Sequence, residues 1–188
     1  MKQNIHGPIE REKLAVPISR RDHSQGPSKA TVTLLEYGDY ECPYCGTAHQ
    51  VVRALQKTLG DRMRFVFRNF PLTNIHPHAE HAAEVAEAAG AKGRFWEMHD
   101  TLYENQDALE DDDLAEYVAA IGLDPRELMP EVISGAHQAS IRKESMGGVQ
   151  SGVNGTPTFF INNLRYDGPD DYEGLLAELV AASEQKGK

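Results

Sequence analysis

The sequence predicts an α/β fold in which a mixed, four-stranded sheet has two flanking helices and is interrupted by a long helical segment. Three observations predict it: a strand–helix–strand pattern near the start, mostly helical residues in the middle, and a strand–strand–helix pattern at the end. We therefore expect an N-terminal arm over residues 1–30, a core formed by residues 31–75 and 151–188, and an all-helical insertion over residues 76–150.

The first half of the core is predicted to be a parallel strand–helix–strand unit. Residues 31–37 (TVTLLEY) are β-branched and mostly apolar, as in a buried strand, although they include Glu36. The apolar residues that follow Cys45 fall on one face of a helix that Gly60 ends. Residues 62–68 (RMRFVFR) alternate as a second strand. The helix is long enough for a right-handed crossover between parallel strands.

The insertion and the second half of the core follow the same reasoning. Helices are predicted over residues 76–90, 94–106, 111–122 and 137–150, the last of them weakened by Gly147-Gly148. A short helix is expected after Asp124, and Pro130 should break or kink it. Two strands, over residues 156–162 and 164–168, are expected to meet at a tight Asn162-Asn163 turn, and a last amphipathic helix follows them.

Composition excludes several classes of protein. The chain has 188 residues, 40% of them apolar, and a net charge of −10, which is typical of a soluble globular protein and unlike one that binds nucleic acid or anionic membranes. The first thirty residues have no apolar segment like that of a secretory signal, and the Arg20-Arg21 pair is followed by polar residues. We expect a cytoplasmic protein with neither nucleic-acid nor membrane partners.

The two cysteines of the chain, Cys42 and Cys45, lie in the sequence CPYC where a predicted strand gives way to a helix. Cys42 is expected at the helix N-cap, with Pro43 in the first turn, where a missing N–H costs nothing. The positive end of the helix stabilises a thiolate, which lowers the pKa of such a cysteine from its usual value of about 8.5. Cys42 is therefore the predicted nucleophile, and Cys45 is within reach to resolve a mixed disulfide.

Two other interpretations of the cysteines stay open. A zinc half-site needs four ligands, but there is no second C-x-x-C, and His76 and His78 lie far along the sequence. Two inert buried thiols are the other alternative. His81 shares a helix face with His78, but we expect this stretch to be a capped, solvated helix start, so no metal site is predicted.

Three stretches, EYGDYECPYC, FRNFPL…HPHA and GVNGTPTFFIN, together resemble the DsbA-like thiol-disulfide oxidoreductases of the thioredoxin superfamily. The resemblance covers residues 31–184 and is greatest to a bacterial branch without signal peptides, related to a domain fused to sodium/proton antiporters. It implies a thioredoxin fold with a helical insertion. It also implies an enzyme that exchanges disulfides with protein or peptide substrates, is recycled by a reductant or oxidant, and needs neither metal nor bound organic cofactor.

The resemblance also assigns roles to residues. Cys42 and Cys45 match the nucleophilic and resolving cysteines, and Pro157 matches a cis-proline that faces them. Thr156 would then offer main-chain hydrogen bonds to an extended substrate. Glu36 matches a buried acid beneath the disulfide, whose pKa burial would raise and which would exchange protons with Cys45. The alternatives are an ordinary strand-edge proline and an edge-strand glutamate that reaches solvent.

The dipeptide between the cysteines departs from DsbA, which has histidine there. Pro43-Tyr44 is the glutaredoxin dipeptide, and we expect both residues to contact substrate. Tyr44 supplies no positive charge, so the dithiol should be less oxidising than that of DsbA, whose reduction potential is about −120 mV. We expect a reduction potential nearer to that of glutaredoxins, which is about −200 to −230 mV. This favours work as a reductase or isomerase.

Two rival functions remain from the sequence. One is a glutathione-dependent enzyme, either a glutaredoxin-like reductase or a relative of the kappa-class transferases; the transferases have serine at the position of Cys42, so the intact pair counts against them. The other is a non-enzymatic module organised by zinc or by protein interaction.

Overall fold

The fold is described by a computed structural model over residues 11–185; the parts of the expected arm and core that fall on residues 1–10 and 186–188 lie outside the described residues. Five strands form one mixed sheet in the order β1-β3-β2-β4-β5. Their bounds are β1 (His23–Gln25), β2 (Val32–Gly38), β3 (Met63–Asn69), β4 (Thr158–Ile161) and β5 (Leu164–Arg165). The α/β class and the predicted order of the elements are confirmed.

Parallel strands β2 and β3 are joined by helix α1 (Pro43–Leu59) and the short 3-10 helix η1 (Gly60–Arg62), as predicted. Strand β4 pairs antiparallel with β2 and forms a hairpin with β5. Asn162 and Asn163 turn this hairpin with φ of 47° and 70°, which asparagine tolerates well. The predicted strand over residues 164–168 is only two residues long, because Gly168-Pro169 turns the chain away and Tyr166 donates its hydroxyl to the Pro169 carbonyl.

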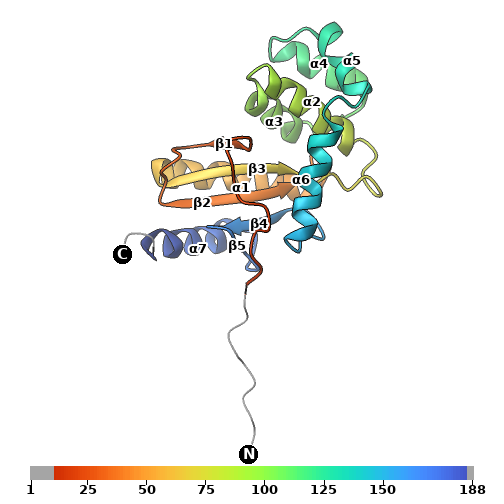
Figure 1. The fold of residues 1–188 in the computed structure, drawn as a ribbon. Coiled ribbons are helices and arrows are strands. Elements are labelled where there is room, and N and C mark those ends of the chain that lie inside the picture. Colours follow the sequence, from red (N-terminus) through yellow and green to blue (C-terminus); the bar gives the residue numbers. More distant parts are fainter. Residues whose placement is uncertain (1–10, 186–188) are drawn as a thin grey trace, which may run out of the picture.

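The N-terminal arm contributes the fifth strand, which the sequence did not predict. β1 pairs antiparallel with the outer edge of β3, and Lys13 bridges to Leu164 at the opposite edge of the sheet. The arm therefore crosses one face of the sheet from edge to edge (Figure 1). His23–Gln25 is short and polar, so its strand conformation depends on the free edge of β3 rather than on its own propensity.

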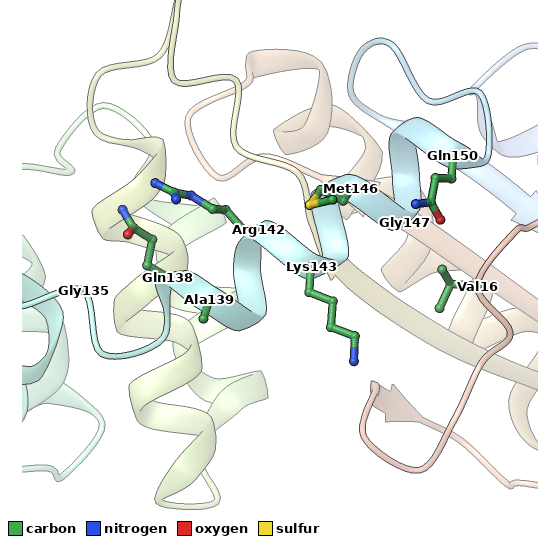
Figure 2. A pocket seen from close by; sticks show the side chains of 9 residues that line it. All are labelled: Val16, Gly135, Gln138, Ala139, Arg142, Lys143, Met146, Gly147 and Gln150. Atoms are coloured by element: carbon green, nitrogen blue, oxygen red, sulfur yellow. The ribbon is translucent and has the colours of Figure 1, made fainter.

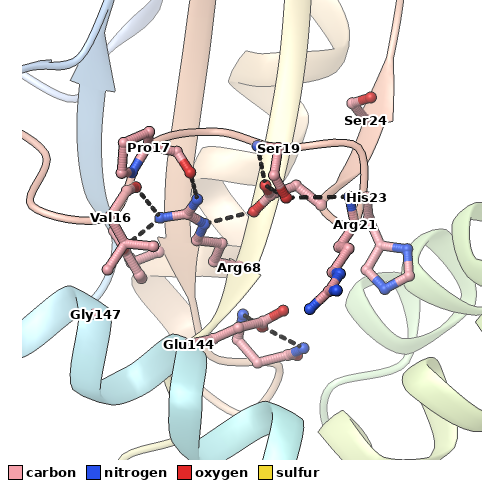
Figure 3. Close-up of polar contacts among 12 residues, drawn as sticks. Val16, Pro17, Ser19, Arg21, His23, Ser24, Arg68, Glu144 and Gly147 are labelled. Atoms are coloured by element: carbon pink, nitrogen blue, oxygen red, sulfur yellow. Dashed lines mark hydrogen bonds and ion pairs between the residues drawn. The ribbon is translucent and has the colours of Figure 1, made fainter.

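A buried ion pair holds the arm against the sheet. Arg68 of β3 donates to Asp22 Oδ1 (2.6 Å), to the carbonyls of Val16 (3.0 Å) and Pro17 (3.2 Å), and to the Tyr37 hydroxyl (2.9 Å). Figure 3 shows the guanidinium group of Arg68 surrounded by the arm. These charge-assisted bonds satisfy a buried cation that would otherwise be costly.

Both faces of the sheet are covered. Helices α1 and α7 (Tyr172–Gln185) pack on one face, while the arm and helix α6 (Gln138–Gln150) lie on the other (Figure 1). This explains why β2 is apolar almost throughout, since its side chains are buried on both sides. The glycines of α6 permit close approach: a Cβ on Gly148 would lie 2.8 Å from the Phe70 ring and 3.0 Å from the Tyr37 ring.

The insertion contains helices α2 (Ala79–Ala91), α3 (Phe95–Glu104), α4 (Asp111–Ala120) and α5 (Pro125–Ile133). The expected break at Pro130 is wrong, because α5 continues to Ile133. Pro130 is exposed, so water can hydrate the carbonyl that loses its partner, while buried Leu128 and Val132 hold both halves of the helix. Within residues 11–185, no helix combines the length and the apolar character needed to cross a membrane.

Candidate active site

The two cysteines lie at the start of α1, shortly after β2 ends. Cys42 is the N-cap residue of α1, with extended backbone angles, and Pro43 occupies the first turn. The Cys42 N–H donates to the Asp39 carbonyl at 3.2 Å. Cys42 is 3% exposed and Cys45 is fully buried. The local sequence thus places one sulfur at the helix N-terminus and the other one turn inside.

The two thiols have opposite pKa shifts. The pKa of Cys42 is lowered to about 5, chiefly by a hydrogen bond from the Cys45 thiol; burial opposes this, and the Thr156 side chain and the N–H groups of Cys45 and Tyr44 support it. Burial raises the pKa of Cys45 well above its ordinary value. At neutral pH the pair therefore holds one thiolate and one thiol, and the thiolate is the outer sulfur.

Glu36 is buried on the central strand β2, between Phe67 of β3 and Phe159 of β4. Its Oε1 has no hydrogen-bond partner among residues 11–185. Burial raises the pKa of Glu36 to about 8, and the negative charges of Asp170 and Cys42 add to this. The alternative of an edge-strand glutamate reaching solvent therefore does not fit the structure.

Thr156 and Pro157 lie beside the nucleophile. The Cys42 Sγ lies 3.4 Å from the Thr156 carbonyl oxygen, a contact that is a hydrogen bond only when Cys42 is protonated, and the Thr156–Pro157 peptide bond is cis. Tyr44 is 74% exposed, and Pro43 beside it is also exposed. The structure thus gathers the four expected substrate-binding residues around the Cys42 sulfur, although they come from two segments far apart in the sequence.

Sequence reasoning missed Asp39 and misjudged His76. Asp39 is buried and accepts hydrogen bonds from the N–H groups of Glu41 (2.8 Å) and Leu72 (2.7 Å) and bonds to His76 Nδ1 (2.8 Å). His76 was expected in a solvated helix start, but its side chain is only 16% exposed. Burial lowers its pKa, but Asp39 and the negative charge of Cys42 outweigh this and raise it above its ordinary value.

A residue of the insertion also holds the dithiol segment. Gln106, just after α3, donates from Nε2 to the carbonyls of Tyr40 (2.7 Å) and Cys42 (2.9 Å). A Cβ on Gly46 would lie only 2.0 Å from Gln106 Oε1. The Gln106 side chain can therefore keep this position only if residue 46 is glycine. Nothing in a single sequence distinguishes Gln106 from any other polar residue after a helix.

The zinc alternative at the cysteines finds no support in the arrangement. Among residues 11–185, one set of three potential metal ligands lies close together, and it consists of His49, His99 and Asp100 rather than the cysteines. His81, one of the histidines near the start of α2, pairs instead with Asp111 at 2.6 Å.

An open groove of about 500 Å³ lies along α6, away from the dithiol (Figure 2). Its lining combines the exposed side chain of Met146 with Arg142 and Lys143, and includes neither cysteine. The groove is therefore separate from the dithiol.

The fold and the dithiol are those of a thioredoxin-like protein, and the chain belongs to the family described as Thioredoxin, which it matches over residues 19–180. It is 44% identical over 170 residues to the Na(+)/H(+) antiporter NhaA 1 of Salinispora arenicola and 43% identical to NhaA 3 of Salinispora tropica. Each match covers 90% of this chain and 26% of the antiporter, so the chain spans about a quarter of these relatives.

Solved structures with the same fold include BdbD of Bacillus subtilis, with a TM-score of 0.81 and 22% identity over 93% of this chain and 99% of BdbD. Another is α-DsbA1 of Wolbachia pipientis, with a TM-score of 0.75 and 18% identity over 93% and 98% of the two chains. The chain therefore has the fold of these structures, and the expected membership of the thioredoxin superfamily is confirmed by the family match over residues 19–180.

Proposed function

We propose that this protein is a thiol-disulfide oxidoreductase that exchanges disulfides with protein or peptide substrates. The observation that carries the proposal is the asymmetric dithiol: a Cys42 sulfur with a pKa of about 5 at a helix N-terminus, backed by a buried, protonated Cys45. A thiolate is the attacking species in disulfide exchange, and this arrangement supplies it at neutral pH.

In the reducing direction, the Cys42 thiolate attacks one sulfur of a substrate disulfide. The substrate S–S bond breaks, a mixed disulfide forms, and the first substrate sulfur leaves as a thiolate. Cys45 then loses its proton and attacks Cys42, which releases the second substrate thiolate and leaves a Cys42–Cys45 disulfide. A recycling reductant restores the dithiol, and with a recycling oxidant the same steps run in reverse.

Glu36 is the proposed proton acceptor for Cys45. Its carboxyl group is buried, lacks a hydrogen-bond partner at Oε1 among the described residues, and raises the pKa of Cys45 by its charge. Because its own pKa is about 8, it can change protonation state near neutral pH.

Substrate binding is proposed at Thr156, Pro157, Pro43 and Tyr44. The first two would offer main-chain groups to an extended peptide, as in strand addition, and the exposed ring of Tyr44 would contact apolar substrate side chains. The Thr156 carbonyl oxygen, 3.4 Å from the Cys42 sulfur, is close enough to place a substrate sulfur against the nucleophile.

The proposed direction is reduction or isomerisation. The pKa of about 5 for Cys42 lies between values of about 7 for thioredoxin and about 3.5 for DsbA, which supports an intermediate potential. A couple near about −200 to −230 mV would stay largely reduced in a cytosol at about −220 to −260 mV, so we also propose a cytoplasmic location. A measured potential near about −120 mV would reverse the proposed direction.

The test is reduction of insulin disulfides by the purified chain. We expect Cys42→Ser to abolish activity and Cys45→Ser to accumulate mixed disulfides with the substrate, detected as a mass increase. Full activity of Cys42→Ser would contradict the proposal. Activity that requires glutathione, with saturable glutathione binding, would favour the glutathione-dependent alternative. Absence of exchange in the wild-type chain would favour a non-enzymatic interaction module.

A further inference from the structure

A second cluster of chemical groups lies between α1 and α3, one turn beyond Cys45. His49 of α1 faces His99 and Asp100 of α3, and each residue places a ligand atom within 4.8 Å of one from each of the other two. The two imidazole rings are 5.3 Å apart, and His49 Nε2 lies 3.5 Å from Asp100 Oδ1. The mechanism proposed for the dithiol uses none of these residues.

The facing atoms are poorly satisfied by the protein itself. His49 Nε2 is buried and has no hydrogen-bond partner among residues 11–185. The Asp100 carboxylate lies 3.5 Å from His49 Nε2 and 3.5 Å from the Arg53 guanidinium group, beyond the usual length of a hydrogen bond. Buried polar groups without partners are rare in folded proteins, and this one lies beside a second imidazole and a carboxylate that could share a ligand with it.

Both imidazole rings are buried, and a neighbouring hydroxyl group orients that of His99. His99 Nδ1 lies 3.0 Å from the Tyr40 hydroxyl, which leaves Nε2 as the free nitrogen. Metal-bound histidines commonly use their second nitrogen in such a bond, which orients the ring.

We propose that His49, His99 and Asp100 bind one divalent transition-metal ion of the zinc class. Two imidazole nitrogens and one carboxylate oxygen are a common three-ligand set for zinc, with water in the fourth position. Asp100 is 38% exposed, which gives the ion and its water a path from solvent. Calcium and magnesium are disfavoured because they take oxygen ligands.

The charges around the site permit a cation. Arg53 is the nearest positive group, but it also pairs with Glu104 at 3.1 Å, which offsets its charge. Bound there, the ion would link α1, which carries the dithiol, to α3 of the helical insertion. It would stabilise the folded chain by mass action without contacting either sulfur.

The test has to separate this site from the dithiol, because a reduced C-x-x-C can itself bind zinc. The chain is therefore first oxidised to the Cys42–Cys45 disulfide and then titrated with Co²⁺, whose visible absorption reports tetrahedral nitrogen and oxygen ligands. We expect one equivalent of Co²⁺ to bind, to be displaced by Zn²⁺, and to raise the melting temperature. No stoichiometric binding by the oxidised chain would overturn the proposal.

Variants identify the ligands. We expect His49→Gln and Asp100→Asn each to weaken Co²⁺ and Zn²⁺ binding at least about tenfold. The matched control is His81→Gln, because His81 forms an exposed pair with Asp111 outside the proposed site. The affinity of this variant for Co²⁺ and Zn²⁺ should equal that of the wild type. If His49→Gln fails to fold by circular dichroism, Asp100→Asn decides the question. Unchanged affinity in Asp100→Asn would refute the site.

Discussion

Cys42 and Cys45 have the same side chain, but their sulfur atoms lie in different surroundings. Cys42 has the helix N-terminus, the Cys45 thiol and Thr156 around it, all of which favour a thiolate, whereas Cys45 is enclosed and favours its neutral form. The sequence predicts the effect of the helix, but the largest cause at Cys42 is the hydrogen bond from Cys45. That bond depends on the geometry of one helical turn.

At the same scale, His76 is predicted to support the Cys42 thiolate with its positive charge. We expect His76→Gln to raise the pKa of Cys42 by up to about one unit, since it removes a nearby opposite charge. The reduced form would lose this stabilisation, so the reduction potential would fall by about 30 mV per unit. The ultraviolet absorbance of the thiolate and equilibration with glutathione measure the two quantities.

The control for this variant is His78→Gln, because its ring makes no bond to Asp39 and its main-chain N–H donates instead to Glu41. Equal thiolate pKa values in the wild type, His76→Gln and His78→Gln would show that the charge of His76 does not act on Cys42.

Glu36 should make the protein less stable and more active. Its pKa of about 8 in the folded chain exceeds its ordinary value of 4.5. Protonation of Glu36 therefore favours the folded chain. This stabilisation is complete below pH 4.5 and is lost as pH rises through about 8, where the buried carboxylate becomes charged. Glu36→Gln should stabilise the chain at neutral pH by at most about 3 kcal/mol, and slow the resolving step by about a hundredfold.

Urea unfolding at several pH values and the decay of the mixed disulfide measure these two effects. Glu116→Gln, on an exposed face of α4, is the control for a carboxylate in water. If Glu36→Gln is no more stable than the wild type at pH 7, burial of Glu36 does not cost folding free energy at that pH.

Among the elements, the contact between α1 and the end of α3 positions the dithiol. Gln106 holds the carbonyls of Tyr40 and Cys42, and the absent side chain of Gly46 makes room for it. The helical insertion is therefore part of the active-site scaffold and not only an appendage of the sheet.

This contact predicts a coupling between two substitutions. Gly46→Ala should destabilise the chain by about 1–2 kcal/mol, because it displaces Gln106 from the Tyr40 carbonyl, while the Cys42 carbonyl keeps the N–H of residue 46. In the Gln106→Ala background the same change should be neutral or stabilising, since alanine favours a helix by up to about 1 kcal/mol over glycine. Urea unfolding of the four chains measures the cycle, and simple additivity would mean that the two residues do not interact.

At the scale of the whole molecule, the low pKa of Cys42 links redox state to stability. Because its pKa of about 5 in the folded chain is below its usual value of about 8.5, the thiolate stabilises the reduced chain fully above about pH 8.5, and this stabilisation is lost as pH falls through about 5. We expect reduced wild type to exceed Cys42→Ser in stability at pH 8 and to approach it near pH 5. A difference that does not change with pH would contradict a stabilised thiolate.

Much of the molecule follows from local pattern. The strand–helix–strand start, the alternation in 62–68, the asparagine hairpin and the place of Cys42 at a helix N-terminus are all visible in short windows of sequence. Periodicity and capping act between residues a few positions apart, so they can be recognised without the fold. The break expected at Pro130 does not occur, because packing from the insertion core outweighed a local rule.

The sequence by itself determined the α/β class, the position of the dithiol at a strand–helix junction and the roles expected of its two sulfurs. Only the tertiary structure decided that β1 would complete the sheet, that His76 would meet Asp39 beside Cys42, and that His49 would face His99 and Asp100. Each of these contacts joins segments separated by tens of residues. Their energies come from burial and from the charge of a distant partner, and local sequence carries no record of either.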